Sequence, residues 1–246
     1  MTRVLAALCL GALALGGCQQ AAGGSERSES ARDFPTADRP VSELGANRFS
    51  TETAREAVNE AQTVMDLAEI RPGMTVADIG AGEGYYTVRL AERVGAQGRV
   101  LAQDIDADAL RKLGLRVERE RLENVSIKQG AEDDPRLPDD SFDRVFMVHM
   151  YHEVSEPYAL IWRMRSSLKP GGRVIVVDVD RPTDKHGIPP ALLFCEFAAV
   201  GFRLSEFVRK PELQGYYAQF EMEDEAPEPA QIQPCTQADA LAVAMQ

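Results

Sequence analysis

Three glycines separated by single residues, Gly80, Gly82 and Gly84, follow the apolar run 76–79 and precede an amphipathic run. Glycine adopts backbone angles that other residues resist, and its missing side chain lets a ligand approach the main chain. If the apolar run is a strand of an open α/β sheet, the loop lies at the carboxyl edge, where these folds bind ligands. The spacing therefore predicts a small-molecule site, and it differs from the G-x-G-x-x-G spacing of dinucleotide-binding loops.

Carboxylates accompany this loop. Asp78 lies at the end of the first apolar run, and Asp104 closes the second one. A carboxylate at the end of the neighbouring strand can accept hydrogen bonds from both hydroxyls of a ribose. Asp106 is expected to cap the helix that follows. Taken singly, each acid could instead satisfy loop amides or cap a turn, so the prediction of ligand binding depends on the ordered set.

Groups that could move a proton stand after the fourth apolar run, in the segment VHMYHEV. His152 could act as a base near neutral pH, and Tyr151 could orient a substrate or line a ligand pocket. The alternative is that these residues simply begin the next helix. The spacing of His149, His152 and Glu153 could suggest a metal. However, the chain has only three histidines, the third is His186 in a Pro-flanked loop, and cysteines do not cluster. No metal site is therefore predicted.

The elements that must position these residues alternate along the chain. Apolar runs predict strands at 76–79, 100–102, 125–127, 142–149 and 173–179, and helical periodicity predicts helices at 51–68, 86–94, 107–113 and 157–168. Nearly continuous apolar strands suit a parallel sheet that is covered on both faces. Their alternation with helices predicts a doubly wound α/β sheet. The last two alternating runs, 202–208 and 216–220, predict an antiparallel hairpin at a sheet edge.

Taken together, these motifs resemble those of the class I S-adenosylmethionine-dependent methyltransferases of the methyltransferase-domain type. The resemblance covers residues 47–221 and implies a Rossmann-like, mostly parallel seven-stranded sheet with an antiparallel C-terminal hairpin. It also implies S-adenosyl-L-methionine as the cofactor. Residues that match the family's motif for the methionine part of the cofactor are Asp78, Gly80, Gly82 and Gly84, and the one that matches its ribose ligand is Asp104.

The family's adenine motif is altered here, because Gly-Asp-Ala is replaced by Gly130-Ala131-Glu132. Ala131 occupies the usual acidic position. The resemblance therefore implies that Glu132 or Asp133 reaches the adenine amino group instead. The same resemblance places the segment of His149 over the methyl group of the cofactor.

The N-terminus resembles a bacterial lipoprotein signal. A short basic start is followed by the apolar run 4–15, which is too short to span a bilayer, and then by Leu-Gly-Gly before Cys18. This implies removal of residues 1–17, a lipid on Cys18 and attachment to a membrane of the cell envelope. Gln19, rather than Asp, favours the outer membrane. An ordinary signal peptide is the alternative, and the chain would be cytoplasmic if the lipobox is not used.

The predicted organisation has four parts: the signal 1–17, a flexible tether 18–46, the methyltransferase domain 47–221 and an acidic, Pro-rich loose tail 222–246. After signal removal and lipidation, two cysteines remain. Cys195 and Cys235 could pair in an oxidising compartment. The favoured expectation is instead a buried Cys195 and an unpaired Cys235 in a mobile tail.

The net charge of -12 argues against nucleic acid as the main partner. The resemblance implies methyl transfer to an unidentified small molecule, lipid or protein group. The alternative hypothesis is a non-catalytic envelope lipoprotein that uses the fold as a ligand-binding scaffold or sensor. Nicotinamide-dependent oxidoreduction is a more distant alternative, because the glycine spacing differs. The export signal conflicts with the enzyme hypothesis, since S-adenosylmethionine is made in the cytoplasm.

Overall fold

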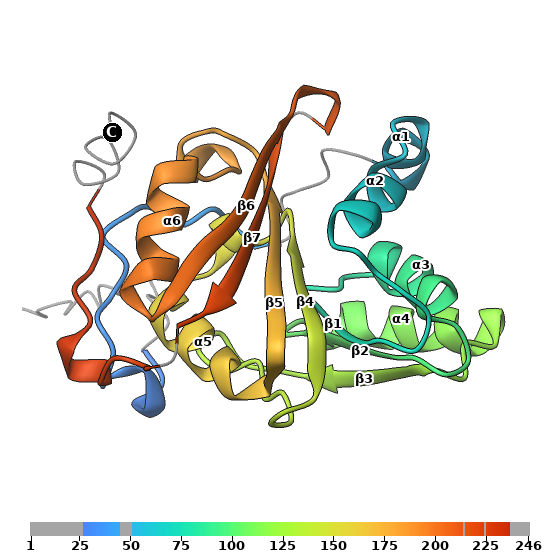
Figure 1. The fold of residues 1–246 in the computed structure, drawn as a ribbon, viewed down its shortest axis with the longest axis horizontal. Helices are drawn as coiled ribbons and strands as arrows, with labels where there is room; N and C mark the ends of the chain where they lie inside the picture. Colours follow the sequence, from blue (N-terminus) through green and yellow to red (C-terminus); the bar gives the residue numbers. More distant parts are fainter. Residues whose placement is uncertain (1–26, 45–50, 214, 224, 237–246) are drawn as a thin grey trace, which may run out of the picture.

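The computed structural model describes residues 27–44, 51–213, 215–223 and 225–236. Its centre is a seven-stranded sheet with the strand order β3-β2-β1-β4-β5-β7-β6 (Figure 1). Strands β1 to β5 pair in parallel, and β7 pairs antiparallel with both β5 and β6. This confirms the predicted sheet and its C-terminal hairpin. The strands are β1 Thr75–Ile79, β2 Arg99–Asp104, β3 Val125–Gln129, β4 Phe142–Val148, β5 Leu168–Asp178, β6 Phe202–Lys210 and β7 Gly215–Met222.

Helices cover both faces of the sheet. Those on one face are α2 Glu60–Leu67, α3 Tyr85–Val94 and α4 Ala107–Glu120, and those on the other are α5 Pro157–Met164 and α6 Pro190–Ala199 (Figure 1). Successive strand residues serve opposite faces: Val76 packs with the α2 and α3 cluster, and Ala77 packs with the α5 and α6 cluster. Because both faces are buried, the central strands β1, β4 and β5 are apolar over most of their buried residues, as the sequence indicated.

The strand order reverses at β1, which lies between β2 and β4. The chain leaves the carboxyl end of β1 towards α3 on one face of the sheet, and it leaves that of β4 towards α5 on the other face. A crevice therefore opens between β1 and β4. The glycine loop 80–84 follows β1, Asp104 ends β2, and the segment 149–153 follows β4. The topology thus brings the predicted site segments to one edge.

The helix predicted over 51–68 is broken into two. Thr51 caps the first part, α1 Glu52–Ala57, by accepting a hydrogen bond from Ala54 N. Asn59 then adopts the left-handed conformation with φ 51°, and α2 begins after it. Asparagine tolerates this conformation better than most residues do, so the chain turns here despite its helical periodicity.

The segment 27–44 lies against the domain, although it was expected to belong to a flexible tether. Phe34 is buried, and its ring contacts Trp162 edge-on at 5.6 Å between centroids. Arg39 Nε lies 2.7 Å from Glu196 Oε1, and both side chains are fully buried. For these residues the expectation of a tether is wrong, because a polar segment with few apolar residues still finds buried partners.

The C-terminal residues 225–236 also pack on the domain. Cys235 forms a disulfide with Cys195 of α6, and its backbone N donates to Tyr158 Oη at 2.7 Å. Ile232 and Cys235 are both buried in the cluster that contains α5 and α6. The expectation of an unpaired Cys235 in a mobile tail is wrong, because these two residues give an otherwise polar segment something to bury.

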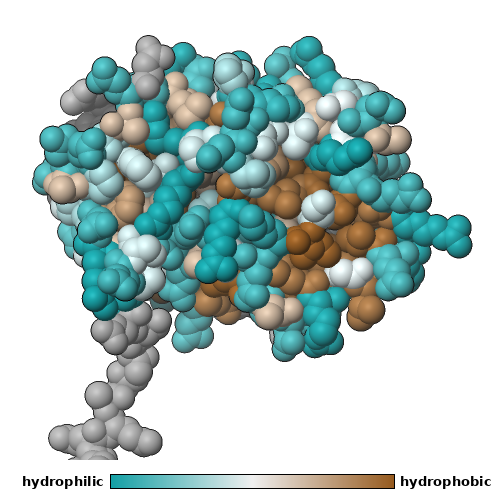
Figure 2. Space-filling view, turned by 90° about the horizontal axis from the view of Figure 1, so that it is seen from below, coloured by the Kyte–Doolittle hydropathy of each residue, from teal (hydrophilic) through white to brown (hydrophobic). Residues whose placement is uncertain are grey.

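No helix in the part of the chain that is described is both long enough and apolar enough to cross a bilayer. Figure 2 shows that the lower face of the molecule carries apolar surface on one side and mainly polar surface on the other. The predicted signal 1–17 and Cys18 lie outside the described residues.

Candidate functional site

A cavity of about 1870 Å³ opens at the carboxyl edge of the sheet. Its walls come from the glycine loop, the ends of β2 and β3, the segment after β4, helix α1 and residues 41–44. Pockets for a single small ligand usually occupy about 300 to 1,000 Å³. This cavity therefore has room for two ligands side by side.

The three glycines of the loop have different roles. A Cβ on Gly80 would lie 2.9 Å from Met150 Cγ, and a Cβ on Gly84 would lie 2.4 Å from Leu113 Cδ1. Gly82 has φ 55°, and its Cβ would meet no atom within 4 Å. Gly80 and Gly84 are thus required by the protein's own packing. Gly82 presents bare main chain to open space, as a cradle for a cofactor requires.

Asp104 lies on the cavity wall and holds the loop in place. Gly82 N donates to its Oδ2 at 2.8 Å, and Asp106 N donates to its Oδ1 at 2.9 Å. A carboxylate has about four acceptor positions, so two remain for a diol. Asp106 accepts from Asp108 N at 2.8 Å, which confirms its predicted role as the cap of α4. The position of Asp104 fits the predicted ribose contact.

Asp78 lies beneath the loop rather than on the cavity wall. It is buried, and Thr87 Oγ1 donates to its Oδ2 at 2.6 Å. Burial raises the pKa of Asp78 to about 6, against the opposing effects of the Thr87 hydrogen bond and the charge of Arg55. The side chain therefore joins the end of β1 to the first turn of α3. The side chain of Asp78 does not line the cavity, so the structure gives it no direct contact with a cofactor there. It can affect the methionine part of a cofactor only by supporting the glycine loop.

The turn after β3 brings Ala131 and Glu132 to the cavity. Glu132 Oε2 accepts a hydrogen bond from Ser155 Oγ at 2.9 Å. Asp133 is buried and pairs with Arg163, whose Nη1 lies 2.6 Å from its Oδ2. Asp133 is thus engaged by the protein itself. Of the two carboxylates predicted to reach the adenine amino group, Glu132 is the exposed one.

Tyr151 and His152 face the interior. Both are fully buried, and neither lines the cavity. Tyr151 Oη donates to Glu196 Oε2 at 2.6 Å, and His152 Nδ1 lies 2.9 and 3.0 Å from the two carboxylate oxygens of Asp178. The 3-10 turn Tyr151–Glu153 points these side chains inward. The structure therefore does not bring the two predicted catalytic side chains into the cavity.

His149 is the histidine that lines the cavity. Its Nε2 lies 3.4 Å from Oε2 of Glu60, a buried residue of α2 whose Oε1 also accepts from Arg55 Nε at 2.9 Å. Burial alone would raise the pKa of Glu60, but His149 and Arg55 together lower it to about 2. An ionised carboxylate thus stands behind a histidine of the cavity wall. Glu60 and Arg55 were missed from the sequence, where charged residues within the predicted helix 51–68 are typical of a solvated surface.

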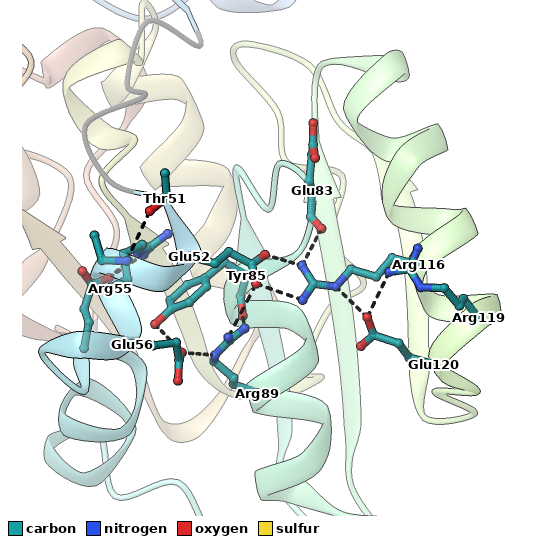
Figure 3. Close-up of polar contacts among 12 residues, drawn as sticks. Thr51, Glu52, Arg55, Glu56, Glu83, Tyr85, Arg89, Arg116, Arg119 and Glu120 are labelled. Atoms are coloured by element: carbon teal, nitrogen blue, oxygen red, sulfur yellow. Dashed lines mark hydrogen bonds and ion pairs between the residues drawn. The ribbon is translucent and has the colours of Figure 1, made fainter.

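Helix α1 is joined to α3 and α4 across the glycine loop (Figure 3). Arg116 of α4 pairs with Glu52. Glu56 accepts from Tyr85 Oη at 2.8 Å and from Arg89 Nε at 2.6 Å. Exposed ion pairs are worth about 0 to 1 kcal/mol each. This wall of the cavity is therefore held by several weak contacts, none of which the sequence predicted.

Comparison with known proteins agrees with this geometry. The family model described as "Methyltransferase domain" matches residues 70–211. The ubiquinone/menaquinone biosynthesis C-methyltransferase UbiE of Idiomarina loihiensis is 33% identical over 120 residues, which cover 48% of this chain and 47% of that protein. UbiE of Shewanella frigidimarina is 32% identical over 124 residues, covering 50% and 48%. The chain thus spans about half the length of the curated relatives it matches.

Solved structures share the fold at lower identity. A SAM-dependent methyltransferase from Aquifex aeolicus superposes with a TM-score of 0.62 and 24% identity, covering 68% of this chain and 90% of that one. The [4+2]-cyclase SpnF superposes with a TM-score of 0.57 and 21% identity, covering 73% and 68%. The second neighbour is named for a different reaction, so the fold alone does not fix the chemistry. The family match over residues 70–211, with a glycine loop open at Gly82 and a carboxylate at Asp104, shows that the chain belongs to the methyltransferase-domain family, as a class I methyltransferase.

Proposed function

We propose that the protein transfers a methyl group from S-adenosylmethionine to a small, largely apolar acceptor. The observation that carries the proposal is one cavity of about 1870 Å³ that contains both the cofactor loop and a second wall around His149. When bound, the cofactor supplies a methyl group on a positively charged sulfur, which is already activated. The protein then has to align the acceptor and take up one proton.

The lining of the cavity supports an apolar acceptor. Its apolar side chains include Val41, Leu44, Val58, Val154 and Leu213. His149 and Glu153 are polar groups of the same lining. An apolar pocket with a few placed polar groups orients a ligand at one ionisable position. The name of the UbiE relatives points in the same direction, because ubiquinone and menaquinone are apolar molecules.

His149 is placed to receive the proton of the acceptor. S-adenosylmethionine, held by the loop at Gly82 and by Asp104, would supply the methyl group, and the acceptor would release one proton. The proton released from the acceptor passes to the imidazole. Glu60, whose Oε2 lies 3.4 Å from His149 Nε2, stabilises the imidazolium that forms. The sequence-based assignment of this role to His152 is replaced by His149 in this proposal.

Calorimetry with S-adenosylmethionine and S-adenosylhomocysteine tests cofactor binding by the full-length protein. Asp104→Ala removes two hydrogen bonds to a charged acceptor, worth about 1.5 kcal/mol or more each, so the Kd should rise by roughly 100-fold. The matched control is Asp66→Asn, since Asp66 is an exposed residue of α2 outside the cavity lining. Failure of the wild type to bind either compound at millimolar concentration would refute the proposal. Binding without transfer to phenolic or quinol acceptors would favour the scaffold alternative.

We further propose that the protein resides in the cell envelope, attached through a lipid on Cys18 and without a nucleic-acid partner. The signal-like N-terminus supports this, and so does the disulfide between Cys195 and Cys235, because disulfides persist in oxidising compartments. Cell fractionation should find the wild type in membranes and Cys18→Ala in the soluble fraction. Alkylation in intact cells should find both remaining cysteines protected. Free thiols and a soluble wild type would contradict this location.

A further inference from the structure

Two of the three histidines of the chain lie beside the carboxylate of Glu153. His152 and Glu153 follow β4, and His186 follows β5. The side-chain ligand atoms of His152, Glu153 and His186 all lie within 4.8 Å of one another. The sequence did not predict this cluster, because His186 stands far along the chain from the other two. Its position next to them results from how the loop after β5 folds.

The loop after β5 is folded back on itself. Val179 O accepts hydrogen bonds from both Arg181 N and Ile188 N at 2.9 Å, which closes the loop. A Cβ on Gly187 would lie 2.4 Å from Val179 O, so only glycine fits beside this closure. His186 adopts the left-handed conformation with φ 52°, which is uncommon outside glycine and is often found at functional sites. The backbone is thus shaped to place one histidine.

Ser42 of the N-terminal segment fastens the two histidine segments together. Its backbone N donates to His152 O at 3.2 Å. Its Oγ donates to Thr183 O at 2.5 Å and accepts from His186 N at 3.2 Å. The two imidazole rings lie edge to face, with 5.7 Å between centroids. Three separate parts of the chain therefore cooperate to build this cluster.

Asp178 fixes which nitrogen of His152 carries the proton. Its two carboxylate oxygens lie 2.9 and 3.0 Å from His152 Nδ1, and both side chains are fully buried. A carboxylate only accepts, so Nδ1 carries a proton, and Nε2 is the nitrogen that a neutral imidazole in this orientation would offer to a metal ion. Nε2 lies on the side of Glu153, 3.9 Å from its Oε1. A histidine held by a carboxylate through its other nitrogen is the usual arrangement behind a metal ligand.

We propose that His152, Glu153 and His186 bind one divalent first-row transition-metal ion, with Zn²⁺ as the reference ion. Two neutral imidazoles and one carboxylate form a ligand set that such ions accept. The charges of Glu153 and Asp178 balance the charge of the ion. In a tetrahedral shell with bonds near 2.05 Å, ligand atoms lie about 3.4 Å apart, so the cluster contracts by roughly 1 Å on binding. The side chains of Glu153 and His186 would make this contraction by rotating, because they are only partly buried.

The cluster reaches the cavity at Glu153. Glu153 lines the cavity, and its side chain is 11% exposed. With three protein ligands, the remaining position takes water or an oxygen of a bound molecule. The ligand class is thus an oxygen-bearing acceptor or substrate analogue at the end of the cavity near His149. This site goes beyond the proposed methyl transfer and can be tested without any cofactor.

Cobalt(II) binding to the untagged full-length protein, stripped of metal beforehand, tests the site. The wild type should bind one Co²⁺ with visible ligand-field bands, and Zn²⁺ should displace it. His186→Asn should weaken binding at least about tenfold, because asparagine keeps the left-handed backbone but removes the ligand. Glu153→Gln should weaken it similarly and keeps the fold even if His186→Asn does not. Circular dichroism of each variant reports on folding.

The matched control is His149→Asn. His149 also has a left-handed backbone, with φ 54°, but it is not in the cluster, so its replacement should leave the affinity for Co²⁺ unchanged within about twofold. The proposal is overturned if excess Co²⁺ gives no visible bands with the wild type. It is also overturned if both cluster variants bind as the wild type does. Thiolate-to-cobalt charge transfer in the near ultraviolet would assign the metal to cysteine instead.

Discussion

Replacing Asp78 by asparagine should make the protein more stable at neutral pH and should flatten its pH dependence. In the folded state, burial raises the pKa of Asp78 from its usual 3.8 to about 6. A pKa difference of one corresponds to about 1.4 kcal/mol, so the unfavourable buried charge costs about 3 kcal/mol. Asparagine still offers an oxygen to Thr87 Oγ1, which donates to Asp78 Oδ2 at 2.6 Å.

The sign of this effect follows from proton binding. Between pH 3.8 and about 6 the folded state holds the Asp78 proton more tightly than the unfolded state does. The stability that this proton provides is fully present below pH 3.8 and is lost as the pH rises through about 6. The variant has no such proton to lose. Relative to the wild type, it should gain up to about 3 kcal/mol between pH 4 and pH 7, less about 1 kcal/mol for a weaker hydrogen bond.

Urea unfolding at several pH values, with the disulfide intact, measures this difference. Subtracting wild type from variant at each pH cancels the titration of all other carboxylates. Asp66→Asn is the control, because Asp66 is exposed and its replacement should give a much smaller and flatter difference. A difference between Asp78→Asn and wild type that does not change with pH, or that falls as pH rises, would show that the buried carboxylate is not protonated as argued.

Three other outcomes are expected. Gly84→Ala should lose at least about 2 kcal/mol of stability, because its Cβ would lie 2.4 Å from Leu113 Cδ1. Gly82→Ala should lose only about 1 kcal/mol and should mainly weaken cofactor affinity. Thermal melts measure the loss of stability, and calorimetry measures the loss of affinity. Cys235→Ser should lower the free energy of unfolding by about 4 kcal/mol, because the disulfide closes a loop with a sequence separation of 40; urea titration checks this, and equal stability of the two proteins would contradict it. Arg39→Met should cost about 3 to 5 kcal/mol by leaving a buried carboxylate without its counter-charge, and adding Glu196→Gln, which still accepts from Tyr151 Oη, should recover most of it; a double variant as unstable as the single one would argue against the pair.

The sheet could be predicted from sequence because its signals are local. Each strand is a short apolar run, and each helix begins at a recognisable point, such as Asp106 before α4. Contacts between distant segments carry no such signal. The pair of Arg39 with Glu196 and the disulfide of Cys235 join residues that nothing in their neighbourhood marks as buried. The sequence therefore predicted the strands and the class of sheet but treated both ends of the domain as loose.

The candidate site was predicted in part for a related reason. Motif spacing located Gly82 and Asp104 on the cavity wall, since both are fixed by the strands they follow. The residues after β4 are set by a turn, and a rotation of one residue decides whether a side chain faces the cavity or the interior. His149 and His152 are three residues apart, yet only the first lines the cavity. Periodicity does not predict the direction of side chains in such a turn.

The docking of residues 27–44 limits the largest distance at which the domain could lie from a bilayer. If Cys18 carries a lipid, the segment that links the lipid to the domain ends at Arg27, whose Nε lies 2.6 Å from Glu156 Oε1, rather than at residue 47. This linking segment then has nine peptide steps, 27 minus 18, and its length cannot exceed about 30 Å even when it is fully extended. A linking segment of 29 steps, 47 minus 18, would reach about 100 Å. If Cys18 carries a lipid, the shorter linking segment would hold Arg27, and with it the docked N-terminal segment, within about 30 Å of the bilayer surface.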